Sequence, residues 1–166
     1  SQATWHVRLE SVLQLPPRAC LDDMVCAIHQ GMSQLFGFRR LVFLQIDGGH
    51  TCLQARGYEG CYAKENIRNI QFMFSSGASV VVQACRSGGS QVLFKSAAQT
   101  LADRQLFTIL RTENILCLPL NHPASGDLVG CILCAQDQPE PVTRESQNDQ
   151  LRGFANRVAL KLNSFS

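Results

Sequence analysis

The stretch that decides the fold runs from Glu113 to Gln136 and reads ENILCLPLNHPASGDLVGCILCAQ. It contains two β-prone runs, Asn114 to Leu120 and Asp127 to Ala135, on either side of the turn-rich segment NHPASG at residues 121–126. Apolar and β-branched runs of this length, separated by Asn, Pro, Ser and Gly, are typical of two strands joined by a turn. The sequence therefore predicts a pair of strands late in the chain.

Upstream of this pair, helix and strand patterns alternate. Leu21 to Phe36 places apolar residues three or four positions apart, with acidic residues in the first turn and a glycine after the last residue, and this predicts a helix. Arg39 to Ile46 and Thr51 to Arg56 are β-prone runs on either side of Asp47-Gly48-Gly49, which predicts an antiparallel hairpin.

The remaining segments are shorter or less regular. Residues 79–85 contain three successive valines, which on propensity alone favour a strand. Gln91 to Lys95 predicts a short strand, Gln99 to Arg111 a helix, and the chain from Thr143 onward a long helix. Residues 57–76 mix glycine, aromatic and polar residues and fit neither pattern.

In this order the elements resemble those of the GAF family. The resemblance is carried by Leu21 to Gly57, by SSGASVVVQACRSGGSQVLF at residues 75–94, and by the opening stretch through Leu118-Pro119-Leu120 and Leu128-Val129-Gly130. It implies an α/β (α+β) fold, in which N- and C-terminal helices flank a mostly antiparallel sheet of about six strands. Ligand-side loops and short helices would cover the other face, and residues 79–85 would be helical.

The length of 166 residues suits one core. Residues 1–13 have helical spacing and two prolines follow, so we expect a connector helix and linker at residues 1–18 and the GAF-like domain at residues 19–166. The chain starts at Ser1 without a methionine, and we expect an excised piece whose output domain is covalently linked in the full-length protein.

Composition argues against several classes of function. The net charge of +2 comes from 15 basic and 13 acidic residues that are scattered, so we expect no nucleic-acid partner. No apolar run approaches the roughly 18 residues that span a bilayer, so we expect no membrane insertion. The eight cysteines lie mostly within apolar segments rather than in a small looped scaffold, which favours a reduced, cytoplasmic protein.

The resemblance also implies a ligand cavity between one sheet face and the intervening loops and short helices. Carried onto this chain, the cavity would take an unknown small molecule, with Arg56 available to meet an anionic group, although a solvated loop position is the simpler reading of that arginine. The cavity residues expected on this basis are Phe43, Gln45, Arg56, Tyr58, Phe72, Phe74, Val81, Cys85, Leu106 and Cys117.

We therefore expect a regulatory sensor module that binds rather than catalyses, with the signal relayed through the terminal helices of a homodimer. The helices have apolar stripes that a two-fold bundle would bury, and packing against the domain's own sheet is the competing use of the same stripes. The stripe residues are Trp5, Leu9, Val12, Phe154, Val158 and Leu162.

Two alternatives stay open, a thiol-dependent reductase of a small oxidised metabolite and a ligand-free dimerisation scaffold filled by Phe72 and Phe74. The motifs for cyclic nucleotides and for covalent tetrapyrroles are missing. Cys131 and Cys134 form a CxxC, but a strand would turn the two side chains to opposite faces of the sheet. The sequence thus predicts no catalytic residue, no metal site and no cofactor.

Overall fold

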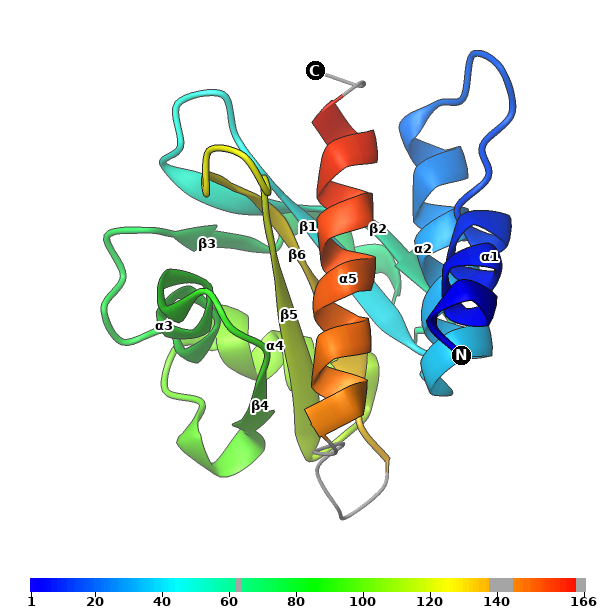
Figure 1. Cartoon of the computed structure of the whole chain (residues 1–166). Coiled ribbons are helices and arrows are strands. Elements are labelled where there is room, and N and C mark those ends of the chain that lie inside the picture. The colour runs from blue at the N-terminus through cyan, green and yellow to red at the C-terminus, as the bar shows by residue number, and fades with distance from the viewer. Residues whose placement is uncertain (62–63, 138–144, 164–166) are drawn as a thin grey trace.

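The computed structural model describes residues 1–61, 64–137 and 145–163. Its centre is a six-stranded sheet in the order β3-β2-β1-β6-β5-β4, in which each neighbouring pair is antiparallel (Figure 1). The sheet predicted from the sequence as mostly antiparallel is thus antiparallel throughout. The strands are β1 (Leu41–Ile46), β2 (Cys52–Glu59), β3 (Gln71–Met73), β4 (Gln91–Phe94), β5 (Asn114–Asn121) and β6 (Leu128–Ala135).

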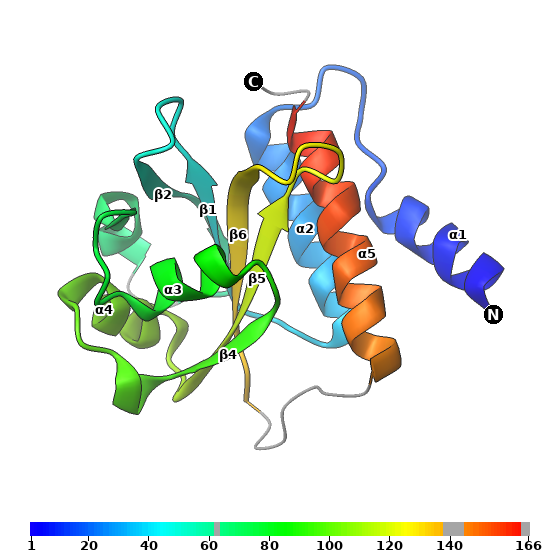
Figure 2. The same ribbon diagram turned by 60° about the vertical axis from the view of Figure 1, so that its left-hand side comes forward.

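Helices cover the two faces of the sheet in two separate groups. The helices from the two chain ends lie on one side and the helices from the middle of the chain lie on the other, as Figure 2 shows. This arrangement confirms the predicted α+β class. The first group is α1 (Gln2–Val12), α2 (Leu21–Phe36) and α5 (Glu145–Leu162); the second is α3 (Val80–Ser87) and α4 (Leu101–Leu110), with short 3₁₀ turns η1 (Lys64–Asn69) and η2 (Lys95–Ala97).

Local capping explains why the ambiguous valine run forms a helix. The side chain of Ser79 accepts a hydrogen bond from the backbone N of Val82, and Gly88 ends α3 in the left-handed region at φ 82°. One side of α3, which includes Val81 and Cys85, is buried. The cap and the amphipathic burial override the β propensity of valine, so the helix implied by the family resemblance is confirmed.

Period-two alternation divides the interior into two apolar layers. On β6, Cys131 and Leu133 face the layer under α3 and α4, which we call the short-helix core, whereas Ile132 and Cys134 face the layer under α1, α2 and α5, which we call the long-helix core. The prediction that the two CxxC thiols point to opposite sides of the sheet is confirmed. These cysteines are therefore not a pair.

The segment from residue 57 to 76, which fitted neither the helix nor the strand pattern, contains the end of strand β2 and the whole of strand β3. β2 continues to Glu59, with a register shift against β1 between Phe43 and Leu44, and after η1 the chain returns as β3 at the edge of the sheet. The apolar side chains of Ile67, Ile70 and Phe72 are buried in the short-helix core. The edge is therefore held by its own hydrophobic contacts.

The first helix packs into the same core as α2 and α5. Leu9 and Leu13 are 2% and 0% exposed and belong to the long-helix core. The division into a connector at residues 1–18 and a domain at residues 19–166 stays a prediction. Among the described helices, none combines the length and the apolar character that a bilayer crossing requires.

Candidate functional site

An open pocket of about 570 Å³ lies on the short-helix side of the sheet. Three elements bound it: the turn between β1 and β2, the turn between β5 and β6, and the C-terminal end of α3. Because β1 and β6 are neighbours in the sheet, the two turns meet at the same end of it. The lining residues are Ile46, His50, Phe74, Cys85, Arg86, Gly88, Asn121, Gly126 and Leu128.

The walls are shaped by specific backbone hydrogen bonds. In the β1–β2 turn, Asp47 accepts hydrogen bonds from the hydroxyl and the backbone N of Thr51, at 2.6 and 2.7 Å, and from the backbone N of Cys52 at 3.0 Å. The hydrogen bond from the Thr51 hydroxyl lowers the pKa of Asp47 to about 2, with help from the backbone donor of Cys52. On the opposite wall, the Arg86 guanidinium donates to the carbonyl of Phe74.

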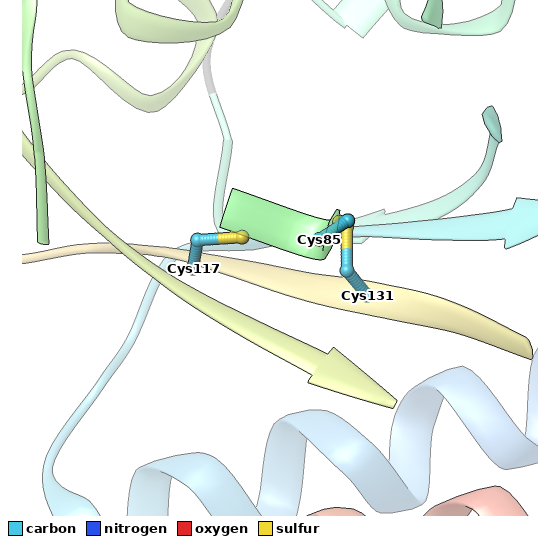
Figure 3. Close-up of side chains that lie close together, drawn as sticks. All are labelled: Cys85, Cys117 and Cys131. Carbon is cyan, nitrogen blue, oxygen red and sulfur yellow. The ribbon is translucent and has the colours of Figure 1, made fainter. Parts of the chain in front are cut away.

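Beneath the pocket, three cysteines from three elements converge. The Sγ atoms of Cys85 on α3, Cys117 on β5 and Cys131 on β6 all lie within 4.8 Å of one another (Figure 3). Cys85 is 5% exposed and the other two are 0% exposed. Cys117 pairs with Leu133 and Cys131 with Pro119, so these two cysteines are diagonal neighbours on one face of the sheet.

The three thiols influence one another's ionisation. Hydrogen bonds from Cys117 and Cys131 lower the pKa of Cys85 to about 5, against the effect of burial. Burial raises the pKa of Cys131 well above its ordinary value. The pKa of Cys117 is also raised: Cys131 stabilises its thiolate, but donation to Cys85 and burial outweigh that effect. Cys85 is therefore the first member of the cluster to ionise.

The structure gathers most of the cavity residues expected from the sequence on one side of the sheet. Phe74 and Cys85 line the pocket itself, and Tyr58 packs against the short-helix core opposite Val42, toward the other end of β1. Four others are buried within that core: Phe72, Val81, Leu106 and Cys117.

Three of the expected residues lie elsewhere. Phe43 is buried in the long-helix core, and Gln45, two residues further along β1, shares its face. Arg56 is exposed on β2. The sequence LVFLQI of β1 does not alternate between polar and apolar residues, because helices cover both faces of the sheet. The sequence alone therefore does not indicate which residues of β1 face the short helices. Val42 and Leu44 are the residues of β1 that face the short-helix core.

Sequence reasoning missed the turn residues of the pocket and the cysteine cluster. His50 lines the pocket from the exposed tip of the hairpin, with a left-handed φ of 56°. Since Cys85, Cys117 and Cys131 come from three different elements, no spacing motif reveals them. The available signal was the shared face of the two strands, combined with the helix that packs on it.

On the far side of the sheet, aromatic contacts connect all three long helices. The rings of Trp5 and Phe36 meet edge to face at 5.8 Å, and those of Phe36 and Phe154 at 5.9 Å. Glu10 and Arg157 add an ion pair at 2.5 Å between α1 and α5. Of the expected stripe residues, Leu9, Phe154, Val158 and Leu162 are buried within the chain, and Val12 packs against the same core.

An antiparallel sheet with terminal helices on one face and a pocket under short helices on the other defines the α+β fold of this chain. No family model and no curated protein matches the chain. Among solved structures, it is similar to the GAF domain of a phosphoenolpyruvate-protein phosphotransferase from Coxiella burnetii (TM-score 0.73, 13% identity, 96% of this chain and 90% of that chain).

Two further structures extend the similarity. One is a GAF domain/HD domain protein from Geobacter sulfurreducens (TM-score 0.68, 14% identity, 95% of this chain and 97% of that chain). The other is part of a methyl-accepting chemotaxis protein (TM-score 0.68, 16% identity, 98% of both chains). The chain therefore has the GAF-domain fold, as the resemblance in its sequence implied.

Proposed function

We propose that this chain is a regulatory input module that binds a small molecule in the pocket between α3 and the two turns. The observation that carries the proposal is the position of the pocket. It lies at one end of the sheet, and the opposite face of the same sheet packs against the long helices. Regulation also fits the described relatives, which are a phosphotransferase, an HD-domain protein and a chemotaxis protein. By analogy, a covalently linked output domain receives the signal.

The lining favours a small ligand with an apolar part and a hydrogen-bond acceptor or an anionic group. Ile46, Phe74 and Leu128 supply apolar walls, while His50, Arg86 and Asn121 supply donors, and no Asp or Glu is among the lining residues that the structure describes. A pocket of this size and mixed character suits a metabolite. Since none of these described residues carries a carboxylate that could act as an acid or a base, binding is a better account than acid–base catalysis by a carboxylate.

A direct mechanical route leads from the pocket to the helices. Asn121 and Leu128 line the pocket, and the residues beside them, Leu120 and Val129, pack into the long-helix core. Adjacent residues on a strand point to opposite faces, so a shift of the β5–β6 turn moves both sets together. A ligand that prefers one position of this turn would thereby change how α2 and α5 pack.

A homodimer would require surface other than the buried part of the apolar stripes. Leu9, Phe154, Val158 and Leu162 already pack within the chain, whereas Val7 on α1 and Leu160 on α5 are 71% and 41% exposed. We therefore place the proposed dimer contact on the outer sides of α1 and α5. Native mass spectrometry measures this oligomeric state directly.

The experiment for ligand binding is native mass spectrometry combined with a metabolite screen by thermal shift. Leu128→Trp fills the pocket, and Gln105→Trp adds the same bulk on the exposed side of α4 as the matched control. We expect a compound that stabilises the parent and Gln105→Trp but not Leu128→Trp. A compound that stabilises all three proteins equally would place the binding site elsewhere, and a screen without any stabilising compound would favour the scaffold function.

One observation favours a second candidate, a thiol-dependent reductase of a small oxidised metabolite: Cys85 borders the pocket and has two thiols as neighbours. Complete burial of Cys117 and Cys131 makes them poor partners for direct exchange with external thiols. Turnover of an oxidised metabolite that depends on Cys85 would establish this activity. The scaffold alternative is less well supported, because Phe74 forms a wall of the pocket and leaves it open.

A further inference from the structure

We propose that Cys85, Cys117 and Cys131 form a binding site for a thiophilic trivalent ion of the arsenite or antimonite type. The site lies beneath the pocket for an organic ligand and shares Cys85 with its wall, but it does not depend on what that pocket binds. It assigns the cysteine cluster a role beyond that of small apolar filler in the core.

The geometry brings three ligand atoms to one point. Cys117 and Cys131 project from neighbouring strands, and Cys85 approaches them from the helix that packs above, as Figure 3 shows. All Sγ atoms lie within 4.8 Å of one another, so small side-chain rotations suffice to close on one ion. Diagonal positions on a sheet are about 7–8 Å apart, which is unfavourable for a disulfide between β5 and β6.

The number of ligands narrows the class of ion. Among the residues that the structure describes, no fourth His, Cys, Asp or Glu joins this group. Structural zinc and iron–sulfur clusters generally require four protein ligands. Complete burial of Cys117 and Cys131 also leaves no position for several water ligands. Three sulfur ligands suit an ion that forms a three-coordinate complex with thiolates.

The net charge of the buried complex then favours a trivalent ion among the ions that bind three thiolates. The cluster lies in the short-helix core, where Cys131 is flanked by Leu44 on β1 and Pro119 on β5, and a buried net charge is costly there. Three thiolates leave a charge of −2 with Cu⁺ and −1 with Zn²⁺, but no charge with As³⁺. Arsenite, As(OH)₃, reacts with three thiols to give As(SR)₃ and three waters, with no change of oxidation state.

Access is provided by the pocket. Cys85 belongs both to the cluster and to the pocket wall, so an uncharged As(OH)₃ molecule reaches the first thiol without unfolding the core. Exchange of its hydroxyl groups then passes the ion inward to Cys117 and Cys131. Ligation would fix α3 to β5 and β6, the two strands whose turn forms the opposite side of the pocket.

The test uses the chain with its more accessible thiols removed by Cys20→Ser, Cys26→Ser and Cys52→Ser. Sodium arsenite is added, and stoichiometry is read by native mass spectrometry and coordination by X-ray absorption at the arsenic edge. We expect one arsenic per chain, a mass change corresponding to three displaced protons, and three sulfur neighbours. Zinc and Cu(I), added in parallel, are expected to bind more weakly.

Ligand variants decide which thiols are responsible. Cys85→Ala, Cys85→Val and Cys117→Ala are expected to lose stoichiometric arsenic binding. Cys134 is a buried cysteine on the other face of β6, and Cys134→Ala is expected to retain arsenic binding. Cys85→Val removes the thiol without leaving a cavity, and thermal melting verifies that each variant is folded. The proposal is overturned if the parent binds no arsenic, if folded Cys85→Val still binds it with three sulfurs, or if Zn²⁺ or Cu⁺ binds the cluster more tightly.

Discussion

Asp103 on α4 accepts hydrogen bonds at 2.9 Å from both the hydroxyl of Ser79 and the backbone N of Val80, although its side chain is completely buried. Ser79 is itself the residue that caps α3. One carboxylate on α4 therefore fixes the beginning of the helix whose far end borders the pocket and carries Cys85.

Asp103→Ala is expected to destabilise the chain by about 2–3 kcal/mol, because it leaves the buried Ser79 hydroxyl and the part-buried Val80 amide without their acceptor. Urea denaturation followed by circular dichroism measures the change. Asp127→Ala removes an exposed carboxylate from a turn and is expected to change stability by at most about 0.5 kcal/mol. Equal effects in the two variants would contradict the role of Asp103 in holding α3.

Gly130→Ala is expected to cost about 3 kcal/mol or more, because a Cβ at this position would overlap the carbonyl oxygen of Leu44 on the neighbouring strand. The strand backbone cannot yield without breaking its ladder. At Gly89 a Cβ meets nothing within 4 Å, so Gly89→Ala is the matched control and should be nearly neutral. Thermal melting compares the two, and a neutral Gly130→Ala would show that β1 and β6 lie further apart.

Titration of Asp47 gives a pH-dependent prediction. Its pKa is lowered from 3.8 to about 2, first by the Thr51 hydroxyl and then by the Cys52 amide. Because the folded pKa is below the unfolded one, the stabilisation of the hairpin is present above pH 3.8 and is lost as the pH falls through about 2. Carboxyl NMR measures the value directly.

Thr51→Val removes the hydroxyl at nearly constant volume and keeps the backbone donor. The pKa of Asp47 is expected to rise toward its ordinary value in this variant. An unchanged titration would mean that the hydroxyl does not contact the carboxylate in solution.

Phe36→Ala is expected to loosen α1, because Phe36 is the ring through which Trp5 meets Phe154. Each aromatic pair contributes about 0.5–1.5 kcal/mol beyond buried area. Hydrogen exchange of residues 2–12 should accelerate, and Val7→Ala, which trims an exposed side chain of the same helix, should leave it unchanged. No difference between the two variants would show that the buried Leu9 and the Glu10–Arg157 ion pair hold α1 without the Phe36 ring.

The sequence was sufficient for most of the elements, although not for β3, and for the CxxC geometry. α2 runs from Leu21 to Phe36 as its spacing and caps predict, and Cys131 and Cys134 separate as period two requires. The sequence was insufficient to assign the two faces of β1. Because LVFLQI has apolar residues toward both cores, Phe43 was expected in the cavity although it faces the long-helix core. Sequence reasoning also missed His50, because turn chemistry does not reveal which turns meet.

The aromatic contact between α1 and α2 gives the molecule an internal optical probe. Trp5 is the only tryptophan, and it lies on the far side of the sheet from the pocket and the cysteine cluster. A ligand or ion bound at either site cannot quench this indole by touching it. A change in Trp5 emission on binding would therefore report a structural change transmitted through the sheet. One fluorescence titration of the unlabelled protein thus distinguishes a ligand that only occupies its site from one that also alters the long helices.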